Sequence, residues 1–166
     1  MTEFIHEPVL LEEALSALQP AAGRLYVDGT VGGGGHAEAI LEVSGPDGRL
    51  VGFDRDDWAL AAAARRLKRF GDRLELHREP FAGLAKRLAK ASCDGVLLDL
   101  GVSSPQLDEA ERGFSFQSEG PLDMRMSKSG GSAADVVMQA DERMLAQILW
   151  DYGEEKASRR IAKIGR

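Results

Sequence analysis

The chain has 166 residues, enough for one domain with a substantial core or for one domain and an appendage, and its composition, 43% hydrophobic and 29% charged, is ordinary for a globular protein. The formal net charge of -6 weighs against a free-standing nucleic-acid binder, because such proteins usually carry a basic excess. The single cysteine, Cys93, excludes an internal disulfide and a cysteine metal cluster, and we expect no metal. The sequence has no apolar run of about 18 residues and no apolar signal core, so we expect no membrane segment and a cytoplasmic location.

Strands and helices alternate along the chain up to residue 99. Apolar spacing predicts helices over residues 9–18, 36–43, 58–70 and 81–91, and strands over residues 25–28, 49–54, 73–78 and 94–99. Strands that alternate with helices through short connections pair in parallel, with right-handed crossovers that place helices on the sheet faces. The predicted fold class is therefore α/β, with a Rossmann-like, doubly wound parallel sheet.

The character of the sequence changes after residue 100. Residues 101–131 are rich in Gly, Ser, Pro, Asp and Met without a clear period, and we expect a long ordered loop that leads away from the sheet. Ser132–Met138 is compatible with one or two helical turns. Glu142–Tyr152 places its apolar residues on one helical face, and Glu154–Lys163 begins another helix.

A glycine-rich stretch, Gly29–Gly35, separates the first predicted strand from the helix that follows it. Five of its seven residues are glycine, which indicates close approach of a ligand to the backbone, since glycine is costly in regular structure. The pattern Gly32-x-Gly34-x-x-Ala37 matches the dinucleotide motif, and Asp54 has the spacing of an acid that binds ribose hydroxyls. Taken alone, this match favours a nicotinamide-dependent oxidoreductase.

Three acids, Asp28, Asp54 and Asp99, end predicted strands. Ligands of open parallel sheets bind at the carboxyl ends of the strands, so these acids are expected at one site. Asp28 directly precedes the glycine loop, where it would repel a pyrophosphate. It suits a cationic ligand such as the sulfonium and amino groups of S-adenosylmethionine. The charge pattern therefore favours a methyl donor over a dinucleotide.

Long runs of unusual residues make the prediction more specific. The runs are His6-x-Pro-Val-Leu10, Asp28–His36, Phe53–Asp56, Leu97–Asp108, Glu111–Phe116 and Gly120–Met126. On these runs the sequence resembles the bacterial family that methylates N4 of a cytosine in 16S ribosomal RNA, from His6 to about Ile161. The resemblance implies S-adenosylmethionine as cofactor and the small ribosomal subunit, through its 16S ribosomal RNA, as partner.

The resemblance also implies an architecture. The family has the class I S-adenosylmethionine-dependent methyltransferase fold, with a helical domain inserted into the catalytic sheet. Residues 1–105 would form the N-terminal half of the cofactor-binding domain, and residues 106–166 the loop and helices at the start of the inserted domain. Family members are roughly twice as long, so we expect an incomplete sheet. An unpaired apolar strand favours association, and a homodimer is one expectation.

The predicted cofactor site combines Asp28 with positions that the resemblance implies. The full set is Asp28, Gly34, Gly35, His36, Asp54, Phe81, Asp99 and Gln106. By resemblance, residues 34–36 would contact the methionine part of the cofactor, Asp54 the ribose hydroxyls, and Phe81 the adenine. Asp99 would lie at the edge of the cofactor that faces the substrate, and Gln106 completes the set.

Asp99 is the candidate catalytic residue, as the acceptor of a hydrogen bond from the cytosine amine. Many amine-directed methyltransferases have an Asp/Asn-Pro-Pro-aromatic loop after the fourth strand. This chain keeps the acid of that loop but has Leu-Gly-Val-Ser-Ser-Pro after Asp99, so the role of Asp99 is a hypothesis. Two alternatives stay open at this point: a nicotinamide-dependent oxidoreductase and a non-catalytic S-adenosylmethionine-binding fragment.

Overall fold

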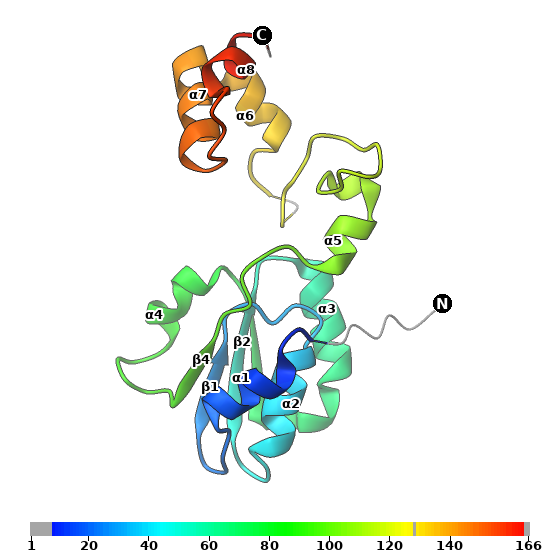
Figure 1. Cartoon of the computed structure of the whole chain (residues 1–166). Helices are drawn as coiled ribbons and strands as arrows, with labels where there is room; N and C mark the ends of the chain where they lie inside the picture. Colours follow the sequence, from blue (N-terminus) through cyan, green and yellow to red (C-terminus); the bar gives the residue numbers. More distant parts are fainter. Residues whose placement is uncertain (1–7, 128, 165–166) are drawn as a thin grey trace. The chain divides into compact units, whose positions relative to one another are not determined.

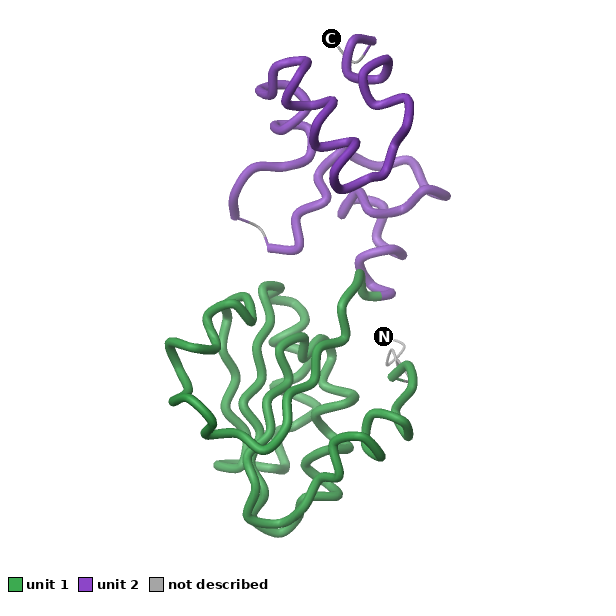
Figure 2. The backbone as a smooth tube through the Cα atoms, turned by 60° about the vertical axis from the view of Figure 1, so that its left-hand side comes forward, with its two compact units in different colours: residues 1–103 green, residues 104–166 purple. Residues whose placement is uncertain are grey.

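The chain folds into two compact units, residues 1–103 and residues 104–166, in a computed structural model that describes residues 8–127 and 129–164 (Figure 2). The motif residue His6 lies outside the described residues. Helices α1 to α4 and strands β1 to β4 belong to the first unit, and helices α5 to α8 belong to the second (Figure 1).

The first unit contains a four-stranded parallel sheet in the order β3-β2-β1-β4. The strands are β1 (Leu25–Asp28), β2 (Arg49–Asp54), β3 (Leu74–Arg78) and β4 (Gly95–Leu97). In the register, Asp28 lies opposite Gly52 of β2 and Leu97 of β4, so the carboxyl ends of the three strands meet at one edge. This strand order is that of a doubly wound sheet, which confirms the predicted fold class.

Helices cover both faces of this sheet. The helical segments are α1 (Leu11–Leu18), α2 (Gly35–Val43), α3 (Asp57–Arg66) and α4 (Leu84–Arg87), with 3-10 turns η1 (Lys68–Arg73) and η2 (Phe81–Gly83). Successive residues of a strand point to opposite faces. On one face Tyr26 and Leu50 pack with Ile40 of α2 and Leu67 after α3, while on the other Val27 and Phe53 pack with Leu84 of α4.

The first predicted helix starts at Leu11 instead of residue 9, because Leu10 has a φ of 54°, and two later helices are also shorter than predicted. The helix predicted over residues 58–70 ends at Arg66 and continues as the 3-10 turn η1, in which Gly71 has a φ of 52°. The helix predicted over residues 81–91 is η2 followed by α4, and it ends because Leu88 is extended. For both later segments the apolar spacing correctly predicted a helix, but it does not indicate the residue at which the backbone leaves the helical conformation.

The fourth strand is also shorter than predicted, with Gly95–Leu97 in place of residues 94–99. Asp94 stands just before the ladder, where its carboxylate accepts hydrogen bonds from Arg24 Nη1 (2.6 Å) and from the Leu25 backbone N–H (2.9 Å). These bonds hold the pKa of the Asp94 carboxyl below its usual range. Asp99 follows the end of β4 by two residues, so the prediction that it ends the strand is wrong.

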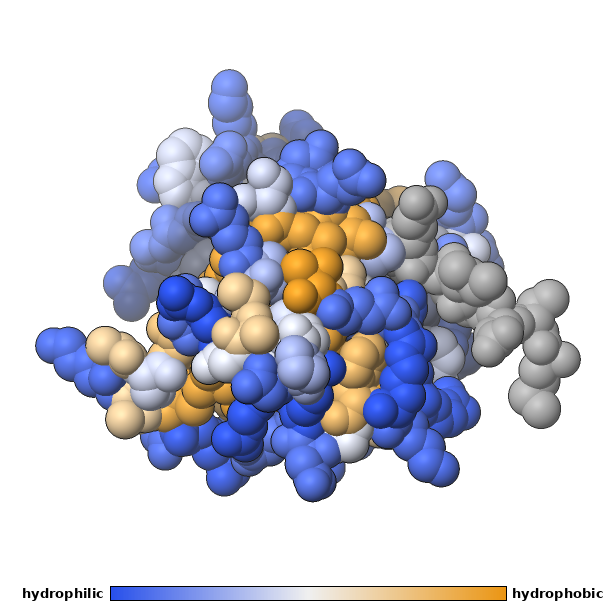
Figure 3. All heavy atoms as spheres, turned by 90° about the horizontal axis from the view of Figure 1, so that it is seen from below, coloured by the Kyte–Doolittle hydropathy of each residue, from blue (hydrophilic) through white to orange (hydrophobic). Residues whose placement is uncertain are grey.

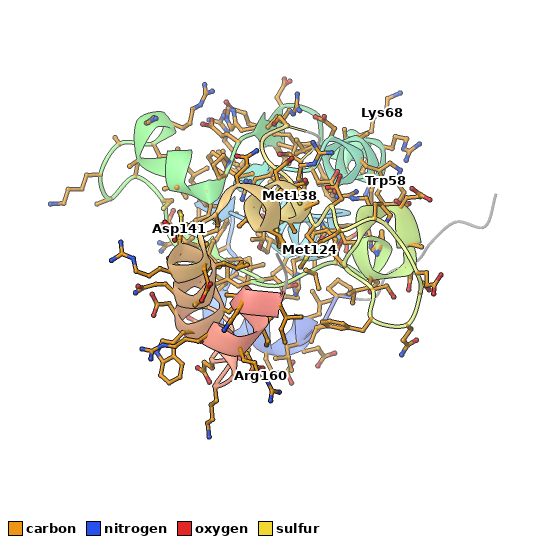
Figure 4. The ribbon with its side chains drawn as sticks, turned by 90° about the horizontal axis from the view of Figure 1, so that it is seen from above. Trp58, Lys68, Met124, Met138, Asp141 and Arg160 are labelled. Carbon is orange, nitrogen blue, oxygen red and sulfur yellow. The ribbon has the colours of Figure 1, made fainter. Side chains whose placement is uncertain are left out.

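The second unit is helical, with a small core of its own. Its segments are α5 (Ser104–Asp108), the 3-10 turn η3 (Ala110–Arg112), α6 (Ala133–Gln139), α7 (Glu142–Asp151) and α8 (Ser158–Ile164). The core is formed by Ala140, Leu145 and Ala162. Asp141 begins α7 by accepting a hydrogen bond from the Met144 N–H (2.7 Å), and Arg160 lies on α8 (Figure 4).

The predictions for this unit are confirmed in part. Helices α6 and α7 fall where the sequence predicts them, and Ser132 forms a capping box with Asp135. The region predicted as one long loop contains α5 and η3, because segments of one turn leave no periodic signal. The last helix starts at Ser158, four residues later than predicted, after Glu154 adopts a φ of 50°.

The loop between η3 and α6 is held by contacts between two of the sequence motifs. Arg112 Nη2 donates to the carbonyls of Arg125 (3.3 Å) and Met126 (3.1 Å), and the Met124 N–H donates to the Arg112 carbonyl (3.0 Å). Asp123 and Arg125 form an ion pair at 2.6 Å, and this hydrogen-bonded arginine lowers the pKa of the Asp123 carboxyl to about 2. These residues therefore organise the loop itself.

One face of the molecule is mixed in polarity. The space-filling view from below shows hydrophilic residues around an area of hydrophobic atoms (Figure 3). Within residues 8–127 and 129–164, no helix combines the length and the apolar character needed to cross a membrane. Over the same residues, no group of three or more His, Cys, Asp or Glu side chains is arranged to hold a metal ion.

Arg73 fastens the end of α2 to the turn before β2, and its replacement should destabilise the first unit. Its guanidinium donates to the carbonyls of Gly48 (2.7 Å) and Leu41 (2.5 Å) and lies over the Phe70 ring. We expect Arg73→Met to lower the free energy of unfolding by about 1–3 kcal/mol in urea titrations, because two buried acceptors lose their donor. The exposed Arg65 on α3 gives the control, Arg65→Met, and equal losses in both variants would contradict this assignment.

Candidate functional site

The candidate site lies at the carboxyl edge of the sheet, where three acids come together. Asp28 and Asp54 are the last residues of the neighbouring strands β1 and β2. Asp99 lies in the segment after β4, and its backbone N–H donates to Thr30 Oγ1 at 2.7 Å. Thr30 in turn follows Asp28 by two residues, so the segment after β4 is joined to the segment after β1.

Asp28 is the buried member of this group, with a relative exposure of 1%. Its Oδ1 accepts a hydrogen bond from the Thr30 backbone N–H at 3.0 Å. Burial raises the pKa of the Asp28 carboxyl to about 7, and the charges of Asp54 and Asp99 raise it further than burial alone would. An ionised Asp28 is therefore unfavourable in the protein alone, and a cationic group placed beside it would stabilise that ionised form.

Asp54 hydrogen-bonds the glycine loop and also lies at the carboxyl edge of the sheet. Its Oδ2 accepts from the Gly32 N–H (2.9 Å) and its Oδ1 from the Asp56 N–H (2.8 Å). Asp56 then caps α3 by accepting from the Trp58 N–H at 3.0 Å. A carboxylate has about four lone-pair positions, so both oxygens of Asp54 can still accept a hydroxyl from a ligand.

In the glycine loop, Gly33 has open space beside its backbone, whereas Gly34 and Gly35 are closely packed. A Cβ added at Gly33 would meet nothing within 4 Å, whereas one at Gly34 would lie 3.1 Å from Leu67 Cδ1, and one at Gly35 would lie 2.4 Å from Pro8 Cγ. Gly34 also has a φ of +85°, which an L side chain rarely adopts. The last three glycines therefore have different roles: residues 34 and 35 permit close packing, and Gly33 leaves the backbone accessible.

His36 and Phe81 both lie near this loop. His36 Nε2 is 3.0 Å from the Val9 carbonyl oxygen, so its ring is tied to the segment before α1. Phe81 is 41% exposed, and its Cβ would be 2.9 Å from a Cβ added at Gly29, so the side chain of Phe81 packs against the backbone directly after β1. Both positions are compatible with their predicted cofactor contacts, which stay predictions.

Gln106 is the predicted site residue that belongs to the second unit, where it is buried in α5. Its cofactor contact stays a prediction. Conversely, Thr30, which links Asp28 to Asp99, and the open Gly33 were not among the predicted site residues. The signal for both was present in the run Asp28–Gly35, where a threonine stands between the acid and the glycines.

The first unit has the class I methyltransferase fold, a doubly wound parallel sheet whose carboxyl edge carries the three acids and the glycine loop. A solved structure titled PH0851 shares the fold, with a TM-score of 0.53 and 22% identity, over 58% of this chain and 22% of that chain. The model of the MraW methylase family matches residues 3–164. The chain belongs to the MraW methylase family.

Curated relatives agree with this assignment. Two proteins named ribosomal RNA small subunit methyltransferase H are similar to the chain. The one from Geotalea uraniireducens is 55% identical over 98% of this chain and 53% of the relative, and the one from Syntrophotalea carbinolica is 56% identical over 96% and 52%. The chain spans about half the length of these relatives. The family match confirms the resemblance seen in the sequence and does not support the alternative of a nicotinamide-dependent oxidoreductase.

The burial of Asp28 predicts a specific dependence of stability on pH. Between the pKa of an unfolded aspartate, about 3.9, and the folded value, the folded state binds more protons than the unfolded state, so stability falls as the pH rises. At pH 8 the wild type must bury a charge that faces Asp54 and Asp99, and Asp28→Asn removes it. We expect Asp28→Asn to be more stable than the wild type at pH 8, by on the order of 1–4 kcal/mol.

The difference should shrink when urea titrations are repeated at pH 5, because the wild type then folds with Asp28 protonated. Asp72→Asn, at an exposed carboxylate in η1, is the matched control for the substitution itself. A stability difference between wild type and Asp28→Asn that is the same at pH 8 and pH 5 would show that Asp28 does not titrate as its burial requires.

Proposed function

We propose that this protein is an S-adenosylmethionine-dependent methyltransferase that methylates N4 of a cytosine in 16S ribosomal RNA. The observation that carries the proposal is the set of three carboxylates, Asp28, Asp54 and Asp99, beside an accessible glycine backbone. Membership of the MraW methylase family and relatives named ribosomal RNA small subunit methyltransferase H support the reaction and the substrate.

The residues at the edge fit the cofactor. Asp54 has acceptor positions for two ribose hydroxyls while it keeps its bonds to Gly32 and Asp56. The buried Asp28 faces two other acids, which favours a ligand with a cationic group and disfavours a pyrophosphate. We assign the methionine part to the backbone of residues 33–35 and to His36, the adenine to Phe81, and a completing contact to Gln106.

Bound S-adenosylmethionine supplies a methyl group on a positively charged sulfur. The acceptor amine of cytosine is weakly nucleophilic because its lone pair is delocalised into the ring. Asp99 would accept a hydrogen bond from this amine, which draws the lone pair out of conjugation with the ring and orients the nitrogen toward the methyl group. The new nitrogen–methyl bond would replace the methyl–sulfur bond, a neutral thioether would leave, and Asp99 would take the amine proton and pass it to solvent. The target base must leave its stack to reach the edge of the sheet, as in other enzymes that modify bases.

The wider assignments follow the same proposal. Its partner is the small ribosomal subunit, through 16S ribosomal RNA, and its location is the cytoplasm. The second unit would form part of a helical domain inserted into the methyltransferase domain, starting near residue 106. The exposed Val96 of β4 and the adjoining Leu98 are compatible with a homodimer, which light scattering of the purified protein would test.

Transfer of labelled methyl groups from S-adenosylmethionine to small ribosomal subunits tests the function directly. Labelled N4-methylcytosine in digested 16S ribosomal RNA is the expected product. Cofactor binding is measured separately by calorimetry. Binding without transfer would support a non-catalytic fragment, and the absence of both would overturn the proposal.

Asp54→Ala should weaken S-adenosylmethionine binding by about 10- to 100-fold, because the hydroxyl acceptors and the bond that holds Gly32 are both lost. Calorimetry gives the dissociation constant. Asp57→Ala is the control, since Asp57 is an exposed acid three residues away that pairs with Arg78 instead. Unchanged affinity in Asp54→Ala would remove Asp54 from the site.

Asp99→Ala should lower kcat by about 100-fold, because Asp99 is assigned to the amine, and should weaken cofactor binding less than Asp54→Ala does, because Asp99 is placed only at the cofactor edge that faces the substrate. Single-turnover transfer to small ribosomal subunits measures the effect, with Asp72→Ala as the control at an exposed acid of the same unit. Full turnover by Asp99→Ala would reject the role given to its carboxylate.

A further inference from the structure

Thr30 lies between two acids of the site and contacts both. Its backbone N–H donates to Asp28 Oδ1 at 3.0 Å, and its hydroxyl also hydrogen-bonds the Asp28 carboxylate. The same hydroxyl oxygen accepts the Asp99 backbone N–H at 2.7 Å. A threonine hydroxyl has one donor and two acceptor positions, so it can serve both acids at once.

The segment that carries Asp99 has left the regular pairing of the sheet. The ladder between β1 and β4 ends at the pair Asp28 and Leu97, and the Gly29 N–H donates to the Leu97 carbonyl at 2.9 Å. Beyond this point Leu98 packs against Gly29 while staying partly exposed, and Leu100 is exposed. The bond from Asp99 to Thr30 therefore continues the connection between the two strands past the end of regular pairing.

Electrostatics makes this bond important for the position of Asp99. Asp28 and Asp99 carry like charges when both are ionised, and they repel each other. A segment free to move would lower that repulsion by moving away from β1. The bond to Thr30 opposes this movement, and donation of the hydroxyl to Asp28 makes its oxygen a better acceptor for the Asp99 N–H.

We propose that Thr30 is a positioning residue for methyl transfer: its hydroxyl fixes the backbone of Asp99, so that the Asp99 carboxylate stays at the edge that Asp28 and Asp54 share. This inference rests on the proposed function and adds a residue that acts through Asp99. Thr30 itself is assigned no contact with cofactor or substrate.

The test compares two substitutions in the full chain. Thr30→Val keeps the shape of the side chain and the backbone bond to Asp28 but removes the hydroxyl, whereas Thr30→Ser keeps the hydroxyl. We expect Thr30→Val to lower kcat about 10- to 100-fold with cofactor affinity within about threefold of wild type, and Thr30→Ser to stay within about threefold in both.

Combining Thr30→Val with Asp99→Ala shows whether Thr30 acts by positioning Asp99 or by stabilising the fold in general. If Thr30 acts through Asp99, the double variant is no slower than Asp99→Ala alone, because the group to be positioned is already absent. An additive loss in the double variant, or full turnover by Thr30→Val, would overturn the proposal. Urea titrations establish that each variant is folded under the assay conditions.

Hydrogen exchange of the Asp99 amide gives a readout that does not depend on activity. We expect it to exchange at least about fivefold faster in Thr30→Val than in wild type, the change that corresponds to loss of one hydrogen bond, and at the wild-type rate in Thr30→Ser. Unchanged exchange in Thr30→Val would also overturn the proposal. If the Asp99 amide exchanges faster in Thr30→Val and at the wild-type rate in Thr30→Ser, but the wild type transfers no methyl group, the proposed function fails while the link between Thr30 and Asp99 stands.

Discussion

Parallel pairing of β1 with both β2 and β4 is the constraint on which the rest of the first unit depends. Because these strands run in the same direction, their last residues reach one edge, and side chains far apart in the sequence become neighbours there. The glycine loop must then leave β1 without blocking that edge. It does so by bonding back to β2, through the Val31 N–H to the Phe53 carbonyl (2.9 Å) and through Gly32 to Asp54.

One residue, Asp54, belongs to both the scaffold and the candidate site. Its bond to Gly32 sets the path of the loop, and its remaining lone pairs can still accept hydrogen bonds from a ligand. A ligand hydroxyl that bound Asp54 would therefore lie beside a loop whose path the same carboxylate sets. This arrangement holds the glycine loop against β2 while no loop side chain fills the space at the carboxyl edge of the sheet. It explains why a run of small residues follows the first strand.

The sequence predicts the parts of the fold that depend on local patterns. Apolar runs that end in acids gave β1 and β2 with their observed bounds, and with them Asp28 and Asp54. The fourth strand was predicted to end at Asp99, two residues too late, because the end of β4 depends on pairing with β1, which is distant in sequence. Thr30 was missed for the same reason: its partner Asp99 is 69 positions away along the chain. The contact of Gln106 depends on a different compact unit and stays a prediction.

The burial of Asp28 has a thermodynamic consequence for ligand uptake. With its pKa near 7, the carboxyl is partly protonated in neutral solution, and a cation that binds beside it favours the ionised form. Uptake and proton release are then reciprocal: each shifts the equilibrium of the other by the same factor. The heat measured on binding includes the ionisation enthalpy of whichever buffer accepts that proton, so one buried side chain makes the apparent enthalpy depend on the choice of buffer.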